Sequence, residues 1–353
     1  MGVVMKRRFR FAYPARLRNV SQISFHSRVS PPNSDLKKAP LMTKLQTING
    51  NDASGMCFGC MQFGGTADKT VSHEMFDLCR ARQVNFFDTA HTYTSGASER
   101  MLGEFVGRER DEIIVATKAA YTGGSSSENI LTQFDESRSR LKMDVVDILY
   151  LHRWDPQTAL DETFDALAKL QQSGLIRYIG VSNFAAWQVM KAQAAAERFG
   201  VRIDIIQPMY SLVKRQAEVE LFPMAMSENI AVASYSPLGA GLLTGKYSAE
   251  ATGRLSTDER YAARYGQSWM QRTAGALADL AAEIDVDPAT LAVAWAAHHP
   301  AVTAPIISAR NATQLNASLV AQDVLMSPQL YARIEALSLR PAPATDRLEE
   351  TTP

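Results

Sequence analysis

The stretch VVDILYLH, residues 145–152, is a near-continuous apolar run that ends in a histidine. Such a run is typical of a strand buried on both faces of a parallel sheet. Seven similar runs predict further strands, at 56–59, 84–88, 112–118, 176–182, 203–208, 230–236 and 304–308. Stretches of helical period lie between them, for example 160–174 and 185–200, and end in Gly174 and Gly200, as helices commonly do. Eight strand–helix units in series predict an α/β fold of the (β/α)8 TIM-barrel type, with a doubly wound sheet as the structural alternative.

The composition is typical of a soluble globular protein. Of 353 residues, 46% are hydrophobic and 21% are charged, and the formal net charge is +0. A neutral chain offers no broad electrostatic attraction to nucleic acid or to an anionic membrane. It contains no apolar run long enough to cross a bilayer, and its three cysteines, Cys57, Cys60 and Cys79, are too few for a disulfide scaffold. We therefore expect a cytoplasmic protein in which Cys57 and Cys60 are structural.

Three regions of the chain differ in composition. Residues 1–41 carry nine Lys or Arg and one acidic residue, and they lack the apolar core of a secretory signal. They predict a basic, disordered N-terminal extension, for which a stretch upstream of a start at Met42 is the favoured interpretation and a transit peptide is the alternative. Residues 42–340 predict one barrel domain, and residues 341–353 predict a disordered tail. Within the barrel, residues 237–268 are too long for an ordinary strand–helix connection and predict a functional loop after the seventh strand.

Three predicted strands end in a titratable residue: Asp88, Lys118 and His152. Neighbouring strands of a parallel barrel end side by side, so these side chains and Tyr93, in the loop after Asp88, are expected to converge at one mouth. Lys118 can neutralise Asp88, and its ammonium is expected to lower the pKa of Tyr93 from about 10. Tyr93 then donates a proton to a carbonyl oxygen that His152 orients, while another group supplies hydride. The structural alternative is a buried ion pair beside a core histidine.

The chain resembles the aldo-keto reductases over roughly residues 43–340. The resemblance rests on separated motifs in the same order: FFDTAHTYTSGASE (86–99), VDILYLHRWDP (146–156), IRYIGVSNF (176–184) and ASYSPLGAGLLTGKY (233–247). It implies a TIM barrel with a catalytic tetrad at Asp88, Tyr93, Lys118 and His152. It also implies that NADP(H) binds extended across the barrel mouth, without a Rossmann fold.

The resemblance further implies which residues contact the cofactor. Ser182, Asn183 and Gln207 match residues that hold the nicotinamide carboxamide, and Tyr235 matches an aromatic ring that stacks on the nicotinamide. The loop over the pyrophosphate is matched by Ser236, Pro237, Leu238, Gly239 and Lys246, and the segment around the adenosine phosphate by Ser308, Arg310 and Gln314. Where the family often has Asn near the adenine, this chain has Ser318.

The sequence says less about the substrate pocket than about the cofactor site. Met61, Tyr121 and Trp154 each follow a predicted strand end and are expected to line the substrate pocket. The resemblance implies an NADPH-dependent oxidoreductase that reduces an aldehyde or ketone, with hydride from nicotinamide C4 and a proton from Tyr93. The expected partner is a small carbonyl compound, and no metal, nucleic acid or membrane is expected to bind. Neither the particular substrate nor the oligomeric state follows from the sequence.

Two other interpretations are open at this point. Ion-channel β-subunits share the fold and much of the loop signature SPLGAGLLTGKY (236–247), so a cofactor-binding regulatory module is the alternative function. A Rossmann dehydrogenase is another alternative, because GAGLLTG (239–245) imitates a dinucleotide fingerprint. However, its third glycine, Gly245, comes one place late, and the stretch is far from the first strand–helix unit where that fingerprint belongs.

Overall fold

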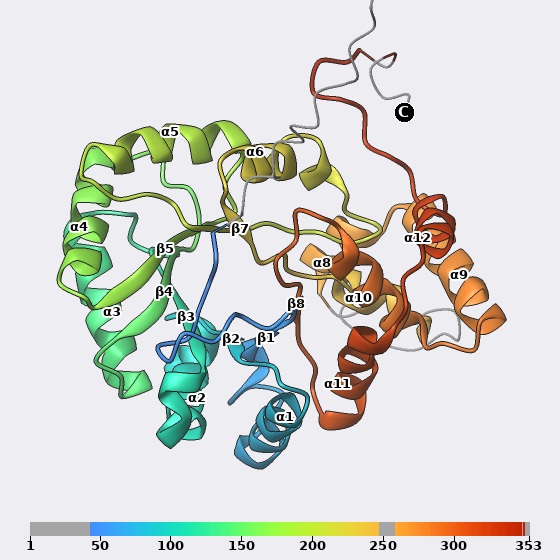
Figure 1. Cartoon of the computed structure of the whole chain (residues 1–353), viewed down its shortest axis with the longest axis horizontal. Coiled ribbons are helices and arrows are strands. Elements are labelled where there is room, and N and C mark those ends of the chain that lie inside the picture. Colours follow the sequence, from blue (N-terminus) through green and yellow to red (C-terminus); the bar gives the residue numbers. More distant parts are fainter. Residues whose placement is uncertain (1–42, 247–257, 348, 350–353) are drawn as a thin grey trace, which may run out of the picture. The chain divides into compact units, whose positions relative to one another are not determined.

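The computed structural model describes residues 43–246, 258–347 and 349 (Figure 1). These residues all belong to one compact unit, Ala39–Pro353. The prediction of a basic extension over 1–41 lies outside the described residues, and so does part of the predicted loop at 237–268. Residues 341–347 form no helix or strand.

Eight parallel strands form one sheet in the order β7-β6-β5-β4-β3-β2-β1-β8. Each overlaps a predicted run, and the bounds are β1 Cys57–Gly59, β2 Phe86–Asp88, β3 Ile114–Ala119, β4 Val146–Leu151, β5 Ile176–Ser182, β6 Ile205–Gln207, β7 Ala231–Val232 and β8 Ile306–Ile307. A doubly wound sheet reverses its strand order partway along, and this sheet does not. The order therefore excludes the doubly wound alternative and the Rossmann fold with it.

Backbone hydrogen bonds also join the two ends of this strand order. The amides of Thr303 and Ala304 donate to the carbonyl of Val232 at 2.9 and 3.2 Å, and the amide of Ile306 donates to the carbonyl of Ser234 at 2.7 Å. A parallel bridge pairs Tyr235 with Ile306. These contacts make the curled sheet consistent with the predicted (β/α)8 fold.

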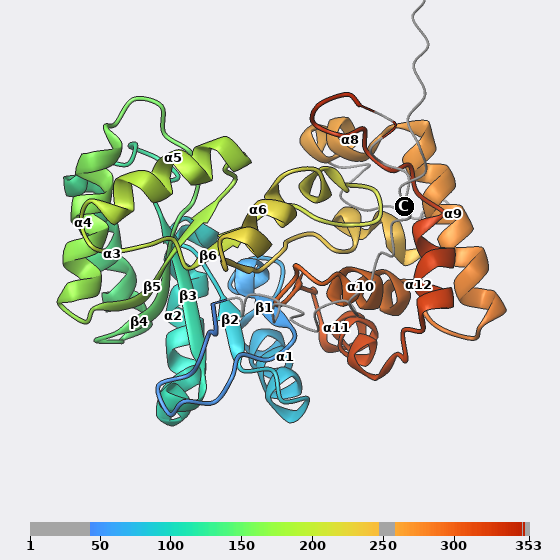
Figure 2. The same ribbon diagram turned by 45° about the horizontal axis from the view of Figure 1, so that its top comes forward.

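Helices follow the strands and lie outside the curled sheet, as both ribbon views show for α3, α4 and α5 (Figures 1 and 2). Their bounds are α1 Lys69–Ala81, α2 Ala97–Val106, α3 Ser127–Leu141, α4 Leu160–Gln172, α5 Ala186–Glu197, α6 Leu221–Ser227, α8 Glu259–Tyr265, α9 Ser268–Glu283, α10 Pro288–His298, α11 Ala312–Leu319 and α12 Pro328–Glu335. Gly174 and Gly200, the predicted helix stops, adopt left-handed φ values of 74° and 72° just beyond α4 and α5. None of these helices is both long and apolar enough to cross a membrane.

Side chains of the strands alternate between two apolar clusters. Phe86 belongs to a small inner cluster with Ile114, Ala116, Ile148, Tyr150 and Ile205, whereas Phe87 belongs to the large cluster between the sheet and the helices. Because successive side chains of a strand point to opposite faces, a residue two places after an inner residue also points inward. Where strands end, this alternation decides which polar side chains enter the mouth of the sheet.

The segment after β7 contains regular structure. A 3-10 turn, η5, spans Gly239–Thr244, and α8 follows the undescribed residues 247–257. Ala240 and Gly241 adopt left-handed φ values of 57° and 91°, which bends the chain sharply. The three cysteines are buried free thiols, which agrees with the structural role predicted for Cys57 and Cys60.

Candidate active site

The side-chain alternation directs three titratable residues into one mouth of the sheet. Asp88 is the last residue of β2, Lys118 lies near the end of β3, and His152 directly follows β4. Each stands two residues after a member of the inner cluster, namely Phe86, Ala116 and Tyr150. Their convergence therefore follows from strand parity and parallel register.

Lys118 is fully buried and uses its ammonium group to join the other members of the site. Its Nζ donates to Asp88 Oδ2 at 2.5 Å, to the carbonyl oxygen of Thr89 at 2.8 Å and to Tyr93 Oη at 3.3 Å. The second oxygen of Asp88 accepts from Gln207 Nε2 at 2.9 Å. An ammonium has three N–H groups, so each one has an acceptor here and the buried charges are neutralised.

The pKa of Tyr93 differs from the prediction. Burial raises the pKa of Tyr93 above its ordinary value, and the nearby charge of Lys118 only partly counteracts this effect, so the expected lowering was wrong. Burial opposes the charge of Lys118, but Asp88 and Tyr93 together raise the pKa of that ammonium. Tyr93 is therefore a neutral phenol next to a cation. Because Lys118 donates to the phenol oxygen, the hydrogen of Tyr93 is free to point into the pocket.

Tyr93 is positioned by a strained turn, η2 (Tyr93–Gly96). Thr94, Ser95 and Gly96 all have left-handed φ values, of 46°, 53° and 81°. The hydroxyl of Thr94 donates to the carbonyl of Phe63 at 2.8 Å and accepts from the amide of Ser98 at 3.0 Å. Consecutive left-handed residues are costly and persist only where the surrounding structure holds them. The turn is thereby fixed between the first strand–helix connection and α2.

His152 is a neutral imidazole at this mouth. Burial, followed by the charges of Lys118 and Arg153, lowers the pKa of His152 to about 3. Its ring centroid lies 5.8 Å from that of Tyr93 and 4.8 Å from that of Tyr121. Its Nδ1 is enclosed and has no hydrogen-bond partner among the described residues, and none of these residues hydrogen-bonds to its Nε2 either. A neutral imidazole can donate one hydrogen bond from such a nitrogen.

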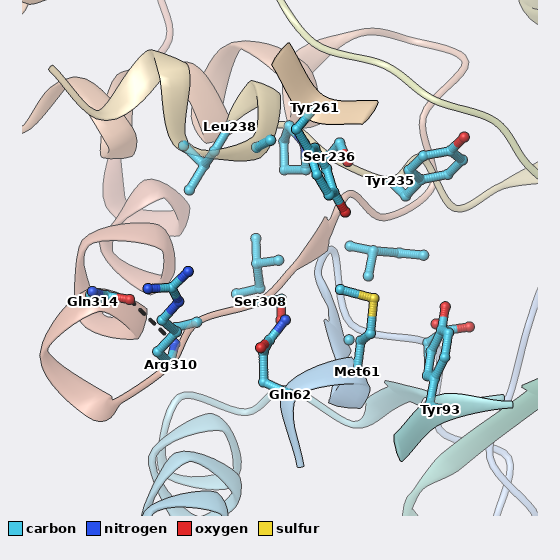
Figure 3. Close-up of a pocket in the computed structure, with 18 of the residues that line it drawn as sticks. Met61, Gln62, Tyr93, Tyr235, Ser236, Leu238, Tyr261, Ser308, Arg310 and Gln314 are labelled. Atoms are coloured by element: carbon cyan, nitrogen blue, oxygen red, sulfur yellow. Dashed lines mark hydrogen bonds between the residues drawn. The ribbon is translucent and has the colours of Figure 1, made fainter. Parts of the chain in front are cut away.

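A pocket of about 870 Å³ opens over these residues (Figure 3). Most predicted site residues line it: Met61, Asp88, Tyr93, Tyr121, His152, Ser182, Asn183, Gln207, Tyr235, Ser236, Pro237, Leu238, Lys246, Ser308, Arg310 and Gln314. Lys118 and Gly239 are buried and do not line the pocket themselves, but Lys118 is hydrogen-bonded to the lining residue Asp88. Trp154 does not line the pocket: its ring packs edge-on against Phe184 and Trp187, with centroid separations of 5.2 and 5.7 Å.

A hydrogen-bonded chain forms the pocket wall beside His152. Asn183 has a left-handed φ of 58°, and its Nδ2 donates to the carbonyl of His152 at 2.9 Å. Tyr235 Oη donates to Asn183 Oδ1 at 2.8 Å, and Ser182 Oγ donates to the carbonyl of Gln207 at 3.0 Å. Burial raises the pKa of Tyr235 to about 12, so it too is a neutral phenol. These amides and hydroxyls hydrogen-bond to one another, and with the half-buried ring of Tyr235 they form a polar wall of the pocket.

The far end of the pocket is cationic. Arg310 is exposed, lines the pocket just before α11 and forms no ion pair with the described residues (Figure 3). Its amide donates to Gln314 Oε1 at 3.3 Å, and the side chain of Asn311 caps the helix by accepting from the amide of Gln314 at 2.9 Å. A guanidinium beside a helix N-terminus suits a phosphate. Ser318, the departure from the family pattern, is buried, and the neighbouring Ala317 lines the pocket instead.

The lining also contains residues that were not predicted, among them Gln62, Arg153, Arg260, Tyr261 and Arg264. Arg153 directly follows His152, and Gln62 directly follows Met61, so adjacency to a chosen residue was the available signal. The other three stand on α8, within the stretch predicted as a functional loop but without any motif of their own. Figure 3 shows Tyr261 reaching from α8 toward the pocket, on the side opposite Gln62 and Met61.

Comparisons with known proteins agree with this geometry. The family model described as "Aldo/keto reductase family" matches residues 55–339. A protein of Arabidopsis thaliana named "Probable voltage-gated potassium channel subunit beta" is 32% identical over 309 residues, which cover 81% of this chain and 93% of that protein. "Uncharacterized oxidoreductase YrpG" of Bacillus subtilis is 30% identical over 300 residues, covering 80% and 91%. "Norsolorinic acid reductase stcV" of Emericella nidulans is 29% identical over 317 residues, covering 82% and 80%.

Proposed function

Because the chain belongs to the aldo/keto reductase family, we propose that it is an NADPH-dependent enzyme that reduces an aldehyde or a ketone to an alcohol, with Tyr93 as general acid. Membership supports an oxidoreductase in general. The choice of cofactor, the carbonyl substrate and the role of Tyr93 are the specific content of the proposal. The proposal also includes a fully closed eight-stranded barrel. Its closure is supported by the backbone hydrogen bonds from Thr303, Ala304 and Ile306 to the carbonyls of Val232 and Ser234, at and just after β7.

The observation that carries the proposal is the contact of Lys118 Nζ with Tyr93 Oη at 3.3 Å beside a neutral His152. A carbonyl oxygen between the phenol and the imidazole accepts a hydrogen bond from each. As the carbonyl is reduced, its oxygen becomes an alkoxide and takes the proton of Tyr93. An alkoxide is a stronger base than a phenolate, so this transfer is favourable even though burial raises the pKa of Tyr93. Lys118 then stabilises the phenolate that remains.

The cofactor proposed for this pocket is NADPH. When bound, it supplies hydride to the carbonyl carbon and leaves as NADP⁺, so that hydride and the proton of Tyr93 together balance the reduction. Asn183, Gln207 and the ring of Tyr235 are the residues proposed to hold the nicotinamide end. Arg310 and Lys246 are proposed to hold the phosphates. Lys246 Nζ lies so near Gly241 that a Cβ added to this glycine would stand 2.9 Å from it, which suits a tight loop over an anionic group.

The test is NADPH oxidation across a panel of aldehydes and ketones with the unmodified chain and with Tyr93→Phe. The substitution keeps the ring and removes the transferable proton. Since general acid catalysis typically contributes about 10²- to 10⁴-fold, kcat should fall within that range while the Kd of NADPH changes little. Tyr121→Phe is the matched control, because it removes the same atom from another pocket tyrosine that does not contact Lys118. A Tyr93→Phe variant with the kcat of the unmodified chain would show that another group supplies the proton.

A regulatory, cofactor-binding module is the second candidate function. Two relatives named "Probable voltage-gated potassium channel subunit beta", from Arabidopsis thaliana and from Oryza sativa subsp. japonica, are each 32% identical to this chain. Under this alternative, NADPH binds but no carbonyl in the panel is turned over. Turnover of any member at a rate that depends on Tyr93 favours the enzyme.

A further inference from the structure

The catalytic end of the pocket carries an excess of positive charge. Arg153, Arg260 and Arg264 line the pocket and are exposed. Among the described residues, the carboxylates that line the same pocket are Asp88 and Asp287. Asp88 is neutralised by its buried ion pair, and Asp287 caps α10 by accepting from the amide of Ala289 at 2.7 Å. Asp287 is therefore the lining carboxylate without an ion pair, and it is held at the N-terminus of α10, so the arginines outnumber the carboxylates that could neutralise them.

Arg153 lies beside the residues of the proposed chemistry. Its guanidinium carbon lies 5.0 Å from the ring centroid of Tyr121, and that ring is 4.8 Å from the ring of His152. The side chain forms no hydrogen bond or ion pair with the part of the chain that the structure describes. Stacking on an aromatic ring orients the planar guanidinium and leaves its N–H groups available. A planar fork of this kind matches the two oxygens of a carboxylate.

The two other arginines have partners on their own segment. Arg260 forms an exposed ion pair with Asp258 at 3.0 Å, and Arg264 lies over the ring of Tyr261, with its guanidinium carbon 5.7 Å from the centroid. Both stand on α8. Both add positive potential around the mouth; Arg264, like Arg153, lies over a tyrosine ring, but Arg153 lies over the ring that contacts His152.

From these contacts, and resting on the proposed carbonyl reduction, we infer that the substrate carries a carboxylate, which Arg153 binds while the carbonyl lies between Tyr93 and His152. The cofactor phosphates do not account for Arg153, because the cations proposed for them, Arg310 and Lys246, come from other segments of the pocket wall. The substrate class is therefore an anionic aldehyde or ketone whose body packs among the aromatic rings of the mouth.

The experiment compares two aldehydes of similar size, 4-formylbenzoate and its neutral methyl ester, of which the ester is intrinsically the more reactive. The full chain should reduce the anion with the higher kcat/KM. In Arg153→Gln this preference should shrink by about 10- to 100-fold, the size expected of a lost charge-assisted hydrogen bond, chiefly through KM for the anion. Arg153→Lys should restore part of the preference. Arg272→Gln, which removes an exposed charge on α9 outside the pocket, is the matched control and should leave the preference unchanged.

A binding measurement keeps the inference testable without turnover. Calorimetry should give a lower Kd for 4-formylbenzoate than for the ester, with or without NADP⁺, and the difference should shrink in Arg153→Gln. If both aldehydes are reduced equally well and bind equally well, the inference is wrong and the proposed function stands. If neither these aldehydes nor any other carbonyl of the panel is reduced but the anion binds through Arg153, the proposed function is wrong and the anion site stands. If Arg153→Gln weakens both ligands equally, Arg153 supports the pocket without selecting a carboxylate.

Discussion

At the scale of single residues, Lys118 explains why a charged strand end is stable inside the molecule. Asp88 and Lys118 are both buried, and an unpaired charge there would be strongly destabilising. Their contact of 2.5 Å, together with the bonds to Gln207 and Thr89, gives each charged group a partner. The same ammonium also touches Tyr93, so a group required for stability is placed where it can stabilise a phenolate.

Arg310 lies at the opposite end of the pocket, and its substitution tests cofactor choice. NADPH differs from NADH by a 2′-phosphate, which we propose lies at Arg310 beside the N-terminus of α11. Arg310→Ala should raise the Kd of NADPH by about 10- to 150-fold, because a charge-assisted hydrogen bond is worth roughly 1.5–3 kcal/mol, and should hardly change the Kd of NADH. Fluorescence titration of both cofactors measures this. If the Kd values of NADPH and NADH rise by the same factor, Arg310 instead contacts a part of the molecule that the two cofactors share.

At the scale of elements, helix packing determines where the site loops stand. Gly103 lies on the buried face of α2 and meets the backbone of Leu141, the last residue of α3. A Cβ on Gly103 would overlap the carbonyl oxygen of Leu141, so glycine is required by the close approach of the two helices. Because α2 begins at the end of the Tyr93 turn, this contact also supports the position of Tyr93.

Two helical glycines form a matched test of this packing. Gly103→Ala should destabilise the protein by roughly 1–3 kcal/mol, since backbone cannot move aside as a flexible side chain does. Gly275→Ala on α9 has open space around the new methyl and should stabilise it by about 0.5–1 kcal/mol through helix propensity. Urea unfolding of both variants gives the comparison. If the two variants have similar urea midpoints of unfolding, α2 and α3 can move apart without a loss of unfolding free energy.

At the scale of the whole molecule, burial gives two titratable groups opposite effects on acid stability. The pKa of His152 is lowered from 6.5 to about 3, chiefly by burial, so the unfolded chain binds more protons between these values and stability is lost as the pH falls below 6.5. The pKa of Asp204 is raised from 3.8 to about 6 by burial, so the folded chain binds more protons in that window and stability falls as the pH rises through it. Between pH 4 and 6 the two effects oppose each other.

Unfolding free energies at pH 4, 5 and 6 separate these two contributions. The difference between the unmodified chain and His152→Gln should grow with pH by up to about 1.4 kcal/mol per unit. The difference between the unmodified chain and Asp204→Asn should change with the opposite sign, because that carboxyl is stabilised when protonated. Asn keeps an oxygen to accept from the amide of Ile179, which Asp204 now does at 2.9 Å. Parallel curves for all three proteins would show that neither group titrates differently on folding.

The sequence by itself determined the strands, their parallel arrangement and the convergence of Asp88, Lys118 and His152, with Tyr93 from the following loop, at one mouth of the sheet. These features depend on local rules: apolar runs specify buried strands, and a period of two specifies which side chain faces inward. Gln207 and Tyr235, which the family resemblance pointed to, also line the pocket. These local rules act within one strand or between neighbours, so they can be read from the order of residues alone.

The tertiary structure decided what depends on distant segments packing together. The pKa of Tyr93 is raised because burial by several elements outweighs one nearby cation, a balance that no single motif contains. Trp154 turns away from the pocket because Phe184 and Trp187, from the next strand–helix unit, hold its ring. Tyr261 reaches the pocket wall because α8 lies across the mouth from strands that precede it by more than a hundred residues. Burial and contact arise from the whole packed molecule, whereas strand pattern arises from the local chain.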